Sequence, residues 1–355
     1  MIKKLLMKRL LLVLLLCAPC WSAQIIRYVD PDATGVENGT SWTDAYQTLK
    51  DWNTAEGTDL DAANNYMTVY CRSSGGTADT DLCNIGGWKT SATDYIEIIG
   101  TDFPSDGKYS TSAYRIEVTN ANTGLITVSE DFVSISNIQF KVTCTGIAGG
   151  YGINVNGTGA GSELTVDSCI IQGVSSTSGV CYGVFINDFN MSCKISNCVI
   201  YGFVNGADAE HAGIRNWISI TTNVYNCTIY GCYNGIYKFL GTVNATNCAV
   251  GNTSDDFRSL SSVTYCMSDD GDGTNSQDAL SGDWDNEFVD ANNGDFTLVV
   301  GGNAIDNGTD NPGSGLYLDD IIGTTRVSSW DIGAYEYAAS DTGTVDWWWR
   351  RRHNN

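Results

Sequence analysis

The chain has 355 residues, 41 acidic and 19 basic, and a formal net charge of −22 at pH 7. So acidic a surface excludes nucleic acid as a partner, because a phosphate backbone needs a basic face. The length, with 39 Gly and only 4 Pro, suffices for a large core that a repetitive fold can build as one domain.

Residues 1–23 have the pattern of a secretory signal peptide. A basic stretch, residues 3–9, precedes the apolar run 10–16, and Ala23 offers a small residue for cleavage. The apolar run is too short to span a bilayer. Cys17 and Cys20 suggest a lipoprotein signal as the alternative. Leu16 and Pro19, directly before them, are poor matches to the small residue that such a signal needs. We expect a secreted protein, either extracellular or at the cell surface.

Cleavage would leave 15 basic and 41 acidic residues, a net charge of −26, because 1–23 holds four basic residues and no acidic one. No cofactor is fixed by the sequence, and Ca²⁺ is the candidate that this surface suits. Eleven cysteines would remain, so at least one is unpaired or pairs between chains. Cys71 and Cys83 flank a polar loop, and we predict a disulfide between them.

Residues 24–60 are predicted to form an N-terminal cap. They hold a strand at 25–29, a turn-rich loop at 30–38 and an amphipathic helix at 43–55. Residues 61–285 are predicted to be a stack of coils, irregular up to 132. The strand candidates in this irregular part are 67–70, 95–99, 114–118 and 125–128.

Two patterns recur in step between residues 133 and 250. A strand-like run is broken by Asn or Ser at positions spaced 31, 29, 29 and 21 residues apart: Asn137, Ser168, Asn197, Asn226 and Asn247. A Gly followed by a β-branched residue recurs at spacings of 31, 30 and 22: Gly152, Gly183, Gly213 and Gly235. Two patterns that lengthen and shorten together indicate a stacked repeat.

The residues of each repeat predict its shape. Each unit holds three short strands with alternating apolar residues, and no unit can bury that face alone. A single residue between two strands leaves no room for a hairpin, so the chain bends a corner, where Asn tolerates left-handed backbone angles. We predict an all-β fold, a right-handed parallel β-helix with three strands per coil. An inward column of small buried thiols should result: Cys169, Cys198, Cys227 and Cys248.

Residues 251–285 loosen into acidic loops, and residues 286–337 are predicted to be a C-terminal cap. Residues 338–355 are a polar linker with an aromatic and basic tail: Trp347, Trp348, Trp349, Arg350, Arg351 and Arg352. Trp beside Arg favours a membrane or envelope interface. The alternative is a disordered tail.

Both ends of the chain carry motifs of a known family. The segment 28–49, with Trp42 and Tyr46, resembles the opening of many secreted bacterial β-helix proteins. The segments 288–298, 304–306 and 331–337 resemble the choice-of-anchor Q domain of the same group. The resemblance implies a pectate-lyase-like (pectin-lyase-like) fold and says little about activity.

The strand after each Gly should expose a strip of aromatic and polar side chains, our candidate ligand-binding residues: Asn154, Asn156, Phe185, Asn187, Trp217, Tyr237 and Phe239. Rings pack on the apolar faces of pyranoses, and amides bond their hydroxyls. The candidate catalytic residues lie on or beside the same sheet: Arg215, Glu210, Asp188, His211 and Lys238. The alternative is that the rings only cover neighbouring coils.

Two reactions would fit these residues. A polysaccharide lyase needs a base and a charge stabiliser, for which Arg215, Lys238 or His211 would serve, with Asp188 and Glu210 as metal ligands. A glycoside hydrolase needs two carboxylates about 5–9.5 Å apart, which Asp188 and Glu210 would supply. We predict a protein that binds or processes polysaccharide or a cell-envelope glycan. The competing hypothesis is a non-catalytic adhesin or structural spike.

Overall fold

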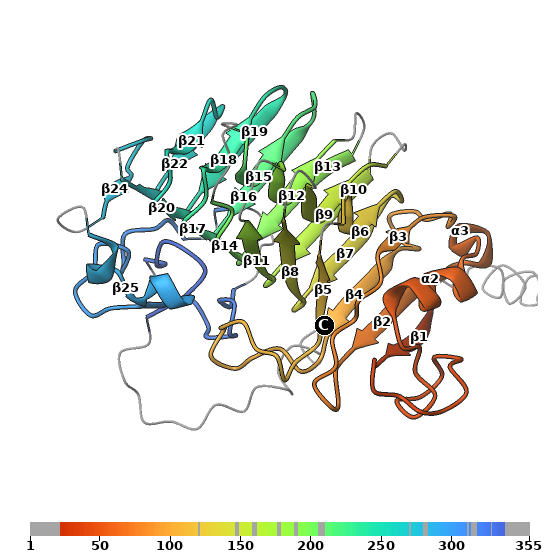
Figure 1. Cartoon of the computed structure of the whole chain (residues 1–355). Helices are drawn as coiled ribbons and strands as arrows, with labels where there is room; N and C mark the ends of the chain where they lie inside the picture. The colour runs from red at the N-terminus through yellow and green to blue at the C-terminus, as the bar shows by residue number, and fades with distance from the viewer. Residues whose placement is uncertain are drawn as a thin grey trace, which may run out of the picture.

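The computed structural model describes residues 22–119, 121–145, 149–157, 162–175, 179–187, 191–204, 210–269, 271–279, 283–310, 312–313, 318–327 and 329–337. Three parallel sheets of nine, eight and seven strands form the sides of one solenoid, and the chain visits them in turn (Figure 1). The predicted right-handed parallel β-helix with three strands per coil is confirmed.

Within each sheet the strands stack in the order in which the chain reaches them. Sheet 1 contains β1 (Ala23–Val29), β2 (Asn65–Cys71), β4 (Ile96–Gly100), β7 (Val133–Ser136), β10 (Ser162–Asp167), β13 (Met191–Ser196), β16 (Thr221–Tyr225), β19 (Thr242–Thr246) and β22 (Ser262–Thr264). Sheet 2 contains β5 (Arg115–Thr119), β8 (Gln139–Cys144), β11 (Ile170–Ser175), β14 (Val199–Tyr201), β17 (Thr228–Tyr230), β20 (Ala249–Gly251), β23 (Met267–Ser268) and β24 (Gln277–Asp278). Sheet 3 contains β3 (Cys83–Ile85), β6 (Gly124–Val128), β9 (Gly150–Val155), β12 (Cys181–Ile186), β15 (Ala212–Asn216), β18 (Asn234–Lys238) and β21 (Asp255–Arg258).

The corner between sheets 1 and 2 is where the Asn/Ser positions lie. All five residues have a positive φ, from 49° to 57°, as the sequence predicts for a one-residue bend. Their side chains bond along the column only in part. Asn247 Nδ2 donates to Asn226 Oδ1 at 3.1 Å, but Asn197 Nδ2 donates to Asp167 Oδ1 instead, at 3.0 Å.

The Gly positions of sheet 3 are forced by a close approach between coils. A Cβ built on Gly152 would lie 2.6 Å from the carbonyl oxygen of Gly183 and 2.7 Å from Ile171 Cγ2. A Cβ on Gly183 would lie 2.5 Å from the oxygen of Gly213. The added carbon would therefore point at the core, although the β-branched residue that follows each Gly is itself fully buried. Glycine alone permits two successive residues on the inner side.

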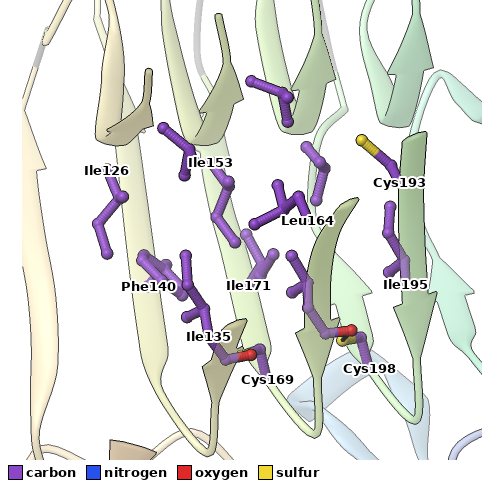
Figure 2. Packing of buried hydrophobic residues seen from close by; sticks show 14 of the residues in the cluster. Ile126, Ile135, Phe140, Ile153, Leu164, Cys169, Ile171, Cys193, Ile195 and Cys198 are labelled. Carbon is purple, nitrogen blue, oxygen red and sulfur yellow. Dashed lines mark hydrogen bonds between the residues drawn. The ribbon is translucent and has the colours of Figure 1, made fainter. Parts of the chain in front are cut away.

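The core runs the length of the solenoid between the three sheets. Figure 2 shows Leu164, Ile171 and Ile195, from three different strands, pointing into this interior. The predicted thiol column is present, and a fifth residue extends it: Cys169, Cys198, Cys227, Cys248 and Cys266, all fully buried and free of disulfides within the described chain. All five thiols lie in the apolar core cluster, so the column packs as small apolar side chains.

The disulfide prediction is wrong. Cys71 and Cys83 are both buried, and each keeps a free thiol in the described structure. The disulfide in the described part of the chain instead joins Cys144, at the end of β8, to Cys181, at the start of β12. These cysteines are 37 residues apart, and one turn of the solenoid brings them together.

The N-terminal helix begins later than predicted. It is α2 (Leu49–Glu56), followed by α3 (Leu60–Ala63). The side chain of Thr48 accepts a hydrogen bond from the Asp51 N–H at 3.0 Å and so caps α2 at its first turn. Leu49 and Trp52 are fully buried and join the solenoid core, so α2 covers the first coils as a cap should.

The C-terminal segment, of which residues 283–310, 312–313, 318–327 and 329–337 are described, packs through these residues against sheet 2 of the solenoid (Figure 1). It holds η2 (Trp284–Asn286), β25 (Phe288–Asp290), η3 (Ala291–Asn293) and β26 (Asp295–Leu298). Its buried Arg326 donates to Asn197 Oδ1 at 3.3 Å, and Tyr335 Oη donates to the Gly107 carbonyl at 2.9 Å. The segment therefore spans several coils. Its boundaries as a separate cap stay a prediction.

The disulfide gives a first test. Replacing Cys144 and Cys181 together with Ala is expected to lower the free energy of unfolding by about 3–4 kcal/mol, since the bond restrains a long loop in the unfolded chain. Chemical denaturation measures this, with Cys232→Ala as the control for losing one buried free thiol. Peptide mapping without reduction should find residues 144 and 181 linked. A linked Cys71–Cys83 peptide would contradict the structure.

Candidate functional site

The predicted strip lies on the outer face of sheet 3. The strand register places five side chains on consecutive coils in one line: Asn154, Phe185, Arg215, Tyr237 and Arg258. Neighbours of these residues along the strands point inward, since Val155, Ile186 and Ile214 are fully buried. Stacking therefore brings together residues about 20 to 30 positions apart in the sequence.

Arg215 is the centre of this line, and it is enclosed rather than exposed. Its side chain is 0% accessible, and its guanidinium lies 3.4 Å from the Tyr237 ring centroid and 5.0 Å from that of Trp217. Nη2 donates to Glu210 Oε2 at 2.7 Å. Burial lowers the pKa of Arg215, but its ordinary value is so high that the group stays charged. Alternation along the strand predicts that Arg215 faces outward and is exposed. The structure corrects its exposure, because Trp217 of the same coil and Tyr237 of the next coil cover the guanidinium.

Trp217 and Phe239 form an exposed platform beside Arg215. Each follows the last residue of its strand, and the ladder continues through them: Trp217 N–H donates to Ile186 O and Phe239 N–H to Asn216 O. Their rings are parallel within 10°, with centroids 4.4 Å apart. Trp217 is 38% and Phe239 49% exposed. Adjacent coils thus hold two rings in a fixed, solvent-facing stack.

A second aromatic cluster lies on the N-terminal side of Arg215. Tyr182 and Phe185 are stacked with ring centroids 4.9 Å apart, and Tyr151 lies 4.8 Å from Phe185. Burial raises the pKa of Tyr182, and the nearby Arg215 charge opposes that shift. In each strand the Gly and the β-branched residue after it both face inward, so the residue before the Gly faces outward. Strict alternation would place Tyr151 and Tyr182 inside, and sequence reasoning therefore missed them.

The asparagines of the strip differ in exposure. Asn154 is buried, Asn187 is half-buried and Asn156 is exposed. Asn187 N–H donates to Val155 O at 2.9 Å, which holds it one coil before Trp217. Asn156 and Asn187 therefore lie on the two coils before Trp217, and both residues are at least partly exposed.

The remaining candidates occupy different environments. His211 is fully buried, and its Nδ1 accepts a hydrogen bond from the Cys181 N–H at 3.2 Å. The Glu210 side chain is 40% exposed, and Lys238 Nζ donates to Ser261 Oγ at 3.2 Å. Asp188 lies outside the described residues, so the catalytic roles stay proposals.

The metal hypothesis concerns clusters of ligating side chains. Within the described residues no group of three or more His, Cys, Asp or Glu side chains could hold a metal ion. Ca²⁺ therefore stays a prediction, and no donor set in the described chain carries it.

Comparison with protein-family models finds no match, and comparison with curated proteins finds none. Among solved structures the chain is similar to a pectate lyase, Pel9A, with 14% identity and a TM-score of 0.39. The alignment covers 89% of this chain and 97% of that one. Membership of the choice-of-anchor Q group stays a prediction.

Arg215→Ala should lower the free energy of unfolding by about 3 kcal/mol, because it empties a buried site between packed rings. Chemical denaturation measures the loss, and Trp fluorescence should shift to the red as Trp217 loses its support. The control is Lys50→Ala, which breaks an ion pair whose lysine side chain is 54% exposed and should change stability by less than about 1 kcal/mol. Equal losses in both variants would contradict an enclosed Arg215.

Proposed function

We propose that this protein binds polysaccharide through the outer face of sheet 3, and that it acts outside the cell or at the cell surface. The observation that carries the proposal is the exposed, parallel Trp217–Phe239 pair. Rings held in this way offer a rigid apolar surface to the C–H face of a pyranose at little cost in conformational entropy.

The surroundings of the pair support the same conclusion. Exposed or half-buried amides, Asn156 and Asn187, lie on the coils before Trp217, and amides both donate to and accept from sugar hydroxyls. Leu240, 50% exposed, extends the apolar surface beyond Phe239. A few rings flanked by a few polar groups is the usual composition of a sugar-binding surface.

Processing of the bound glycan is a second candidate, favoured by Glu210. Its carboxylate is partly exposed beside the platform, and one of its oxygens bonds to Arg215. In a hydrolase it would act as the general acid or base, and Asp188 would be the second carboxylate. Analysis of products from a polysaccharide panel, with Glu210→Gln as the control, separates processing from binding alone.

Attachment of the protein to a membrane or cell envelope is proposed from the sequence alone. No helix in the described ranges has the length and apolar character needed to cross a membrane. The Trp347–Arg352 tail lies outside the described residues, and its contact with an envelope remains a proposal.

Trp217→Ala and Phe239→Ala should each weaken glycan binding about tenfold, which corresponds to about 1.4 kcal/mol, since each removes half of the platform. Glycan arrays followed by calorimetry on the best ligand provide the measurement. Tyr66→Ala is the matched control, because Tyr66 and Tyr95 form a partly exposed stacked pair on sheet 1. Unchanged glycan affinity in both platform variants would remove the proposed site. If these variants instead lost binding to a protein partner, the adhesin hypothesis would be favoured.

A further inference from the structure

We infer that this face selects uncharged glycans over polyuronates and sulfated chains. The inference rests on the proposed function and narrows its ligand class. It starts from the cations of sheet 3, because recognition of an acidic sugar requires a cation that can reach the carboxylate or sulfate.

The guanidinium of Arg215 is out of reach of a ligand. Glu210 neutralises it through Nη2 at 2.7 Å, and the Tyr237 ring covers one face at 3.4 Å. Nε and Nη1 have no hydrogen-bond partner among the described residues, yet both are buried. A carboxylate would have to displace packed rings to bond them, and it would then compete with Glu210 for the same charge.

Arg258 is engaged as well. Its guanidinium lies 4.1 Å from the Tyr237 centroid, and Nη1 donates to Asn234 Oδ1 at 3.3 Å. Tyr237 is therefore in contact with two guanidinium groups, Arg215 and Arg258, and both serve the packing of the sheet.

Lys238, the last residue of β18, has its ammonium at an exposed position. Lys238 pairs in register with buried Asn216, and its Nζ donates a hydrogen bond to Ser261 Oγ at 3.2 Å. A single exposed ammonium contributes little in water, and it acts against a formal net charge of −22 over the whole chain. An extended polyanion would meet repulsion over distances of about 8 Å at physiological salt.

Apart from the Lys238 ammonium and the Glu210 carboxylate, the accessible groups of this face described above are neutral. Trp217 and Phe239 offer ring surface, and Asn156 and Asn187 offer amides. These groups match the C–H faces and hydroxyls that every pyranose carries, and none of them gains from an added negative charge on the ligand.

The experiment uses polymer pairs that differ in charge but share a backbone: methyl-esterified and de-esterified homogalacturonan, hydroxyethyl and carboxymethyl cellulose, and dextran and dextran sulfate. Binding of the full chain is measured by affinity electrophoresis and calorimetry at about 50 and 300 mM salt. In a pair that binds, the neutral member should bind at least about tenfold more tightly, and added salt should narrow the difference by screening repulsion.

Glu210→Gln supplies a second arm. It removes the charge that neutralises Arg215 while keeping a hydrogen-bond acceptor, so the affinity for the acidic member should rise at least about threefold relative to the affinity for the neutral member. Circular dichroism confirms that the variant is folded.

Three results would overturn the inference. The acidic member could bind as tightly as the neutral one or more tightly, and lose affinity with salt. Glu210→Gln could leave the ratio unchanged. Either result leaves the proposed function standing, because a glycan still binds. Binding of neither member of any pair would remove the proposed function and this inference together.

Discussion

The structure depends on how closely successive coils approach one another at the glycine column of sheet 3. A Cβ at Gly183 would lie 2.5 Å from the next coil's carbonyl oxygen and 2.6 Å from Ile200 Cγ2. No side chain fits at such distances without moving backbone or core. This contact sets both the register of the coils and the local departure from alternation that puts Tyr182 on the same outer face as Phe185.

The register then determines the chemistry of the candidate site. Phe185, Arg215 and Tyr237 come from three coils, and only in-register stacking places them side by side. Because these side chains pack together, the Arg215 guanidinium is buried and cannot reach an anionic ligand. Trp217 and Phe239 remain as the accessible surface. One geometric constraint thus accounts for both the enclosed charge and the neutral platform.

Much of the fold could be predicted from the sequence because each repeat carries its own signals. Asn at the corners and Gly before a β-branched residue have local physical reasons, and both columns are present in the structure. The burial of Arg215 could not be predicted, since alternation gives the face of a strand but not what neighbouring coils lay over it. The Cys144–Cys181 bond was missed because it depends on how one coil lies over the next, whereas proximity in the sequence favoured Cys71 and Cys83.

The most direct measurement of this account compares the stability of two glycine variants by chemical denaturation. Gly183→Ala should lower the free energy of unfolding by about 1–3 kcal/mol or more, because the added methyl group collides with the adjacent coil. Gly86→Ala should change it by less than about 1 kcal/mol, since its nearest neighbours would lie 3.6 Å away and its φ is not positive. If Gly183→Ala is as stable as Gly86→Ala, the coils do not approach as described, and the registered site on sheet 3 is contradicted with them.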